Sequence, residues 1–219
     1  MAIALVDHCK YAAGGSTGGT SAAMNSTGAN LLVAAVGNVN AYGTFVDSKS
    51  NVWTRYGPYG DISLQAISYW ISIPSSVGSA HTFSPSGSAV FATCCVAAFS
   101  GVATAFILGT PIPSNTGGSL TSIQAGSLTP AAANCLVLSA LSMRTTNTVS
   151  VNGGFTITDQ CPFIAATAIG SALAYLIQTS AAAANPTWSW TGANDASSAG
   201  ASIQPPVSAG GGAGGFLIQ

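Results

Sequence analysis

The chain has 219 residues, a formal net charge of −1 and only 4% Asp, Glu, Lys or Arg, whereas an ordinary soluble domain carries about 25%. Without a cluster of Lys and Arg it has no electrostatic footprint for nucleic acid, and without a run of roughly 18 apolar residues it has no membrane span. An uncharged surface also lacks the repulsion that keeps free monomers apart, and suits a protein that works within an assembly.

Residues 1–29 are predicted to form a strand at 2–7 and then a Gly- and Ser-rich arm. The start of the chain carries Asp7 and has neither the basic residues nor the longer apolar run of a signal peptide. We therefore expect the protein to be made in the cytosol and kept there until it assembles or is released.

Residues 30–205 alternate short runs of β-branched and aromatic residues with clusters of Gly, Pro, Ser and Asn, which predicts an all-β domain. Helix caps followed by apolar residues at a 3.6-residue period do not occur at convincing length. The predicted strands are residues 31–36, 52–56, 62–73, 89–99, 120–123, 135–141, 155–158, 172–178, 187–190 and 199–203.

Two of these strands carry additional information. Within residues 62–73 the apolar positions slip by one residue, which indicates a β-bulge. Residues 89–99 are apolar on both faces, which predicts a strand buried between two layers.

Two parts of the domain, residues 30–101 and 134–205, resemble each other weakly. Four short matches occur in the same order and at nearly constant spacing. They pair residues 30–33 with 134–137, 53–54 with 155–156, 66–71 with 172–177, and 81–83 with 186–188. Each half is short for a core of its own. We therefore predict a single β-sandwich (jelly-roll-like) built from two weakly repeated halves, with residues 120–123 as a connecting strand and extended Gly-rich termini.

The sequence contains no arrangement typical of a catalytic site. Five Asp and no Glu leave no sequence pair of carboxylates for glycosidase chemistry. A hydrolase triad would draw on His8 or His81 with a Ser and an Asp, but the GxSxG motif is missing. We therefore predict no catalytic residues and a protein that is not an enzyme.

Metal and cofactor sites are likewise not predicted. Asp7, His8 and Cys9 are consecutive, so in a strand they cannot all face one metal ion. Asp47 and Asn51 flank a segment typical of a tight turn stabilised by side-chain hydrogen bonds, although their oxygens leave a calcium site open as an alternative.

The five cysteines, an odd number, lack the CxxC-type spacing of a zinc site. We expect all five to be buried, reduced thiols that pack as small hydrophobes. They are Cys9, Cys94, Cys95, Cys135 and Cys161.

Aromatic residues supply the candidate contact sites. Trp188 and Trp190 share one strand face, where they either fill the core or form a sugar-stacking platform, and we favour the core. Tyr56, Pro58 and Tyr59 lie in a Gly-rich segment predicted to be a contact loop at one end of the sandwich.

Residues 206–219 form a predicted tail, with a Gly/Ala tract at 208–215 followed by Phe216, Leu217 and Ile218. Ordering such a tract costs about 1 to 2 kcal/mol per residue, so it needs contacts that a lone sandwich does not offer. We expect these three apolar residues to dock on a neighbouring subunit, by adding to its sheet edge or by filling its pocket. The predicted assembly is a homo-oligomer, specifically a trimer.

The order of several motifs resembles β-sandwich (jelly-roll-like) domains of bacteriophage structural proteins and bacterial surface proteins. These motifs are DSKSNVWT at 47–54, AISYW at 66–70, AAFSG at 97–101, AANCLVL at 132–138 and a final Trp-rich hairpin. The resemblance implies a decoration, cement, fibre or adhesion module.

From the resemblance we expect a virion structural protein, most specifically a capsid cement or decoration protein. Its partners would be copies of itself and other virion proteins such as the major capsid protein. The alternative is a tail-fibre or adhesin module that binds surface glycans. A secreted carbohydrate-active enzyme is the weakest interpretation.

Overall fold

The computed structural model describes residues 2–12, 19–39, 43–61, 63, 65–86, 90–103, 107–108, 114–130, 132–144, 146–164 and 169–204. These residues form fourteen strands and no helix, so nothing in this part of the chain offers a helix that could span a membrane. The strands are β1 (Ala4–Tyr11), β2 (Leu31–Val39), β3 (Thr44–Asp47), β4 (Thr54–Asp61), β5 (Gln65–Ser72), β6 (Phe83–Ser86), β7 (Val90–Ser100), β8 (Ile107–Leu108), β9 (Ser114–Gln124), β10 (Cys135–Met143), β11 (Ser150–Val151), β12 (Thr156–Cys161), β13 (Gly170–Gln178) and β14 (Thr187–Gln204).

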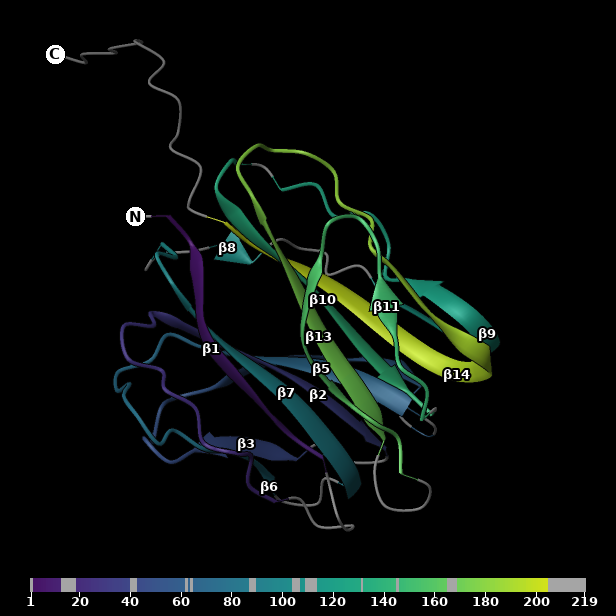
Figure 1. The fold of residues 1–219 in the computed structure, drawn as a ribbon, viewed down its shortest axis with the longest axis horizontal. Coiled ribbons are helices and arrows are strands. Elements are labelled where there is room, and N and C mark those ends of the chain that lie inside the picture. The colour runs from purple at the N-terminus through teal and green to yellow at the C-terminus, as the bar shows by residue number, and fades with distance from the viewer. Residues whose placement is uncertain are drawn as a thin grey trace, which may run out of the picture.

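Two antiparallel sheets pack face to face, as the prediction of an all-β sandwich requires (Figure 1). The first sheet has the order β1-β7-β2-β5-β4. The second has the order β11-β14-β10-β13-β12, and β8 and β9 also pair with β14. The short strands β3 and β6 form a separate two-stranded antiparallel sheet over the outer face of the first sheet.

The middle strands are apolar on both faces because both faces are covered. All nine residues of β10 are buried, and in β7 every residue from Ala92 to Phe99 is buried. This confirms the predicted burial of that strand between layers. Alternate residues of each strand face opposite ways, so one set fills the space between the sheets and the other set packs under an outer layer.

Three clusters of buried side chains result. The central core lies between the sheets and includes Leu31, Tyr69, Phe99, Leu138, Leu173 and Ile203. An outer cluster over the first sheet includes Met24, Phe45 and Phe83. An outer cluster over the second sheet includes Ile123, Phe155, Trp188 and Trp190.

The two sheets share a strand order. The sequence β7-β2-β5-β4 in the first corresponds to β14-β10-β13-β12 in the second. Both edge strands also carry a register shift, between Tyr56 and Tyr59 in β4 and between Ile157 and Asp159 in β12. Matched residues do not all point to the same side of their sheets. Leu31 lies in the central core, whereas Cys135, which matches it in sequence, lies in an outer cluster. The division into two repeated halves stays a prediction.

Two details of the predicted strands are wrong. Residues 187–190 and 199–203 are not the arms of a hairpin but parts of the 18-residue strand β14, whose register shifts lie between Ser189 and Ala196. The extra residue predicted within 62–73 belongs instead to the partner strand β4, because β5 pairs with β2 without a shift over its described residues. Residues 62 and 64 lie outside the described residues.

Candidate functional site

The predicted contact loop is a strand. Tyr56, Pro58 and Tyr59 all belong to β4, the edge strand of the first sheet. The register shift between the two tyrosines brings both rings to the inner face of the sheet, where they are half-buried against the central core. Burial, followed by the neighbouring Tyr56, raises the pKa of Tyr59. The loop assignment is wrong because a Gly-rich bulge looks like a turn in sequence while the strand continues through it.

A shallow concavity lies on the outer side of the same sheet, beside the β3–β6 pair. It has a volume of about 10 Å³, room for about one water molecule, and is lined by Val36, Asn38, Gly43, Thr44, Phe45, Arg55, Ser68, Trp70 and Pro85. The Arg55 guanidinium lies 5.9 Å from the centre of the Trp70 ring. The concavity therefore combines a cation, an aromatic ring and hydroxyl groups.

Asp47 ends β3 and organises the turn that follows. Its carboxylate accepts hydrogen bonds from the backbone N–H groups of Lys49 (2.8 Å) and Asn51 (3.2 Å). It also accepts from the Asn51 amide (3.1 Å) and from the indole Nε1 of Trp53 (2.8 Å). The turn prediction is confirmed, since these four donors hold the segment closed.

The same carboxylate lies next to a buried histidine. His81 Nε2 is 3.4 Å from Asp47 Oδ1, and both side chains are completely buried. On its other side, His81 Nδ1 is 2.8 Å from Ser26 Oγ. Burial lowers the pKa of His81 although Asp47 opposes the shift. Burial alone would raise the pKa of Asp47, but the hydrogen bonds from Asn51, Lys49 and Trp53 outweigh it and the pKa is lowered.

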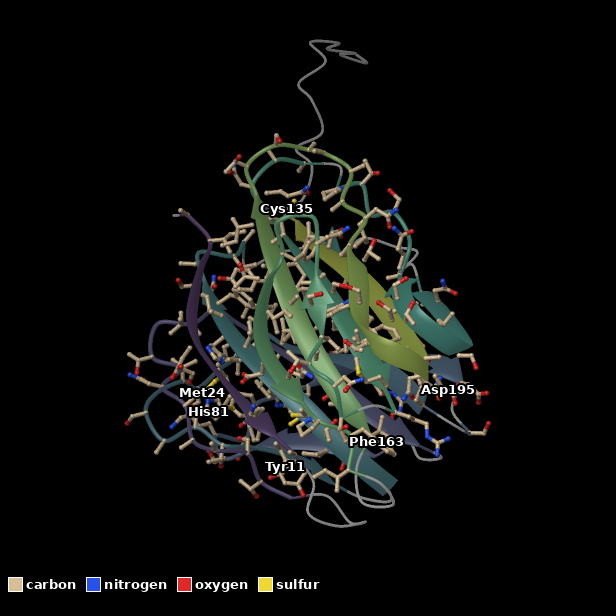
Figure 2. The ribbon with its side chains drawn as sticks, turned by 45° about the vertical axis from the view of Figure 1, so that its right-hand side comes forward. Tyr11, Met24, His81, Cys135, Phe163 and Asp195 are labelled. Atoms are coloured by element: carbon tan, nitrogen blue, oxygen red, sulfur yellow. The ribbon has the colours of Figure 1, made fainter. Side chains whose placement is uncertain are left out.

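Ser26, His81 and Asp47 have the composition of a hydrolase triad. From the sequence, His81 was one of two candidate histidines for a triad, but its Ser and Asp partners could not be named. Ser26 is fully buried, and its hydroxyl donates to the Gly78 carbonyl and accepts from the Gly78 N–H. Met24 pairs with His81 through two backbone hydrogen bonds of 2.9 Å each (Figure 2). The arrangement ties the arm, the Asp47 turn and the start of β6 together.

The other carboxylates also hold the fold. Asp7 accepts from the backbone N–H groups of His8 and Asn25, and Asp61 accepts from that of Ser63. Asp195, on the opposite side of the molecule from His81 (Figure 2), accepts from the N–H of Ser119.

Asp159 joins the two sheets at one side. Its carboxylate is 2.8 Å from Nδ1 of His8, and Lys10 donates to the Gln160 carbonyl at 3.0 Å. These contacts join the edge strands β1 and β12 along a line that we call the β1–β12 seam. His8 thus contacts the other sheet, and it does not form a cluster with Asp7 and Cys9. The described residues contain no group of three or more His, Cys, Asp or Glu placed to hold a metal ion.

All five cysteines are buried and free, as predicted. Cys94 and Cys95 face opposite ways, Cys94 into the outer cluster over the first sheet and Cys95 into the central core. Cys95 Sγ lies 3.8 Å from Cys161 Sγ. Nothing in the sequence indicates this approach, because it joins β7 of one sheet to β12 of the other.

The two tryptophans predicted to fill the core are buried in the outer cluster over the second sheet. Trp188 is fully buried and Trp190 nearly so, and Trp188 Nε1 donates to Ser139 Oγ at 2.8 Å. Neither ring therefore offers a sugar-stacking face. The predicted docking residues Phe216, Leu217 and Ile218 lie outside the described residues.

Comparison with protein family models, curated proteins and solved structures finds no match.

Proposed function

We propose that this protein is a non-enzymatic structural component of a virus particle, specifically a capsid cement or decoration protein of a bacteriophage. The observation that carries the proposal is the use of the carboxylates. All five Asp residues accept hydrogen bonds from backbone or side-chain groups of their own fold. Acid–base catalysis depends on a group positioned for a substrate, whereas each of these carboxylates fastens a turn or a strand edge of its own fold.

The low charge of the surface supports the same role. With nine charged residues in 219, little electrostatic repulsion opposes close packing of many copies. Each sheet contributes to the central core and also has a buried apolar cluster on its outer face, so the described part of the chain buries its cores within one copy. The proposed partners are further copies of this chain, as a trimer, and the major capsid protein. Antibody labelling of purified particles, viewed by negative-stain microscopy, tests the proposed location directly.

Deleting residues 208–219 should leave the sandwich folded and weaken assembly. The fourteen strands of the described residues all lie outside the deleted segment, the last of them ending at Gln204, so circular dichroism should remain that of a β protein. Oligomer size by light scattering, and co-sedimentation with particles, should both fall because Phe216, Leu217 and Ile218 are lost. As a control, Val52→Ser changes an apolar side chain that is 82% exposed on the sandwich and not on the tail. This substitution should leave oligomer size and co-sedimentation unchanged. Undiminished assembly of the truncated chain would show that the tail is not the fastening element.

A second candidate function is glycan binding, favoured by the concavity at Arg55 and Trp70 and not by Tyr56 and Tyr59. An aromatic face with a nearby polar group is a common way to hold a sugar ring. If this function holds, glycan-array binding by the purified protein should be lost in Trp70→Ala and kept in Tyr56→Phe. Binding that survives Trp70→Ala would exclude the concavity as the sugar site.

A further inference from the structure

Two thiols from different sheets meet in the central core. Cys95 lies in β7 and Cys161 ends β12. Their sulfur atoms are 3.8 Å apart, and the two residues are 0% and 2% exposed. Bonded sulfurs lie about 2.05 Å apart, so the two sulfurs must approach each other before a bond can form.

The other three cysteines are placed differently. Cys94 faces the outer cluster, and only its backbone carbonyl contacts Cys161, at 3.5 Å from Sγ. Cys9 lies in the same outer cluster beside Ser21, and burial raises the pKa of its thiol to about 11. Cys135 belongs to the outer cluster of the second sheet, with Gln178 as its polar neighbour. The fold thus selects one pair.

Within the pair, Cys161 is the thiol placed to react first, because it ends β12 beside the contact of Lys10 with Gln160. A hydrogen bond from Cys95 lowers the pKa of Cys161 against the opposing effect of burial, with contributions from Ser171 and the positive charge of Lys10. Burial raises the pKa of Cys95 well above its ordinary value. The thiolate is the reactive form of cysteine. Cys161 also ends the strand that forms the β1–β12 seam, where the side chains of His8 and Lys10 cross between the sheets.

We propose that Cys95 and Cys161 form a modification site at which a peroxide closes a disulfide between the two sheets. The Cys161 thiolate attacks one peroxide oxygen and breaks the O–O bond, which leaves a sulfenic acid and, after protonation, one water. Cys95 Sγ then attacks Cys161 Sγ, the S–O bond breaks, and the second water leaves with the thiol proton. Two thiols and one hydrogen peroxide become one disulfide and two waters.

Hydrogen peroxide suits this site because it is scarcely larger than water and the pair lies beside the β1–β12 seam. The product would close a loop between two cysteines that are 66 positions apart and would fasten the sheets covalently. Cross-linking a long loop removes entropy from the unfolded chain, so the oxidised protein should melt several degrees higher. This inference concerns the folded chain and does not depend on the proposed function.

The test treats the full-length, folded protein with hydrogen peroxide and then counts thiols in denaturant. The count should fall from five to three, and the intact mass should fall by two hydrogen atoms. The melting temperature should rise, and dithiothreitol should reverse the rise. In untreated protein dithiothreitol should leave the melting temperature unchanged.

Adjacent cysteines provide the matched control. Cys94→Ser should still lose two thiols, whereas Cys95→Ser and Cys161→Ser should not form the disulfide. Each variant is first checked for folding by circular dichroism, and Cys161→Ser decides the question if Cys95→Ser does not fold. The proposal fails if the wild type keeps five thiols, if it gains oxygen without losing two hydrogens, or if Cys161→Ser still cross-links.

Discussion

Replacing Asp47 by alanine should lower the free energy of unfolding by about 3 to 5 kcal/mol, the cost of removing one partner from a buried charged network. The substitution deprives Lys49, Asn51 and Trp53 of the acceptor for four hydrogen bonds. It also removes the carboxylate beside the buried ring of His81. Urea unfolding followed by tryptophan fluorescence measures the loss.

Asp61→Ala is the matched control. That carboxylate accepts from the backbone N–H and the hydroxyl of Ser63, two residues away, within an exposed turn. Its removal should change the free energy of unfolding by less than about 1 kcal/mol. Equal effects of the two substitutions would contradict the role assigned to Asp47.

Acid should act on the same network in two stages. The pKa of His81 is lowered from 6.5, so the unfolded chain takes up this proton first and stability begins to fall below about pH 6.5. The pKa of Asp47 is lowered from 3.8, so its contribution is present above that pH and is lost as pH falls through the folded pKa. In Asp47→Ala the second stage should be missing from a plot of unfolding free energy against pH.

Replacing Trp188 by alanine should cost about 3 to 5 kcal/mol, because it empties a large volume in a packed core. The indole is fully buried, and its loss also leaves the Ser139 hydroxyl without its donor. Thermal unfolding in the presence of urea would resolve a change of this size. Trp188→Phe should cost less, since it keeps most of the volume and loses only the hydrogen bond.

Val52→Ala provides the comparison for this prediction. Val52 is 82% exposed, so its truncation should change the free energy of unfolding by less than about 0.5 kcal/mol. If Trp188→Ala were equally mild, the assignment of this ring to the core would be wrong.

The strands could be predicted where hydrophobic periodicity was strong, and less well elsewhere. β2, β7, β10 and β13 are long apolar runs buried on both faces, and the patterns located all of them. β3, β6, β8 and β11 have only two to four residues each, too few to establish an alternation. The union of two predicted strands into β14 depends on pairing with β9 and β10, which is a tertiary effect.

The sites depended still more on tertiary structure. The Asp47 turn was predictable because its donors lie within six residues of the carboxylate. The contacts of His81 with Ser26 and of Cys95 with Cys161 join residues 55 and 66 positions apart. Such pairs leave no local signal, since only the stacking of layers brings them together.

The long edge strand β9 has a consequence for association. Its eleven residues are Ser, Asn, Thr, Gly, Leu, Ile and Gln, mostly exposed, without a single ionisable group. A neighbour that covers this strand would immobilise few long, many-rotamer side chains, each of which costs about 0.5 to 1.5 kcal/mol on binding. None of its own side chains carries a charge that would have to lose water. Contacts made there should therefore be nearly independent of ionic strength, so that salt would neither assemble nor dissolve them.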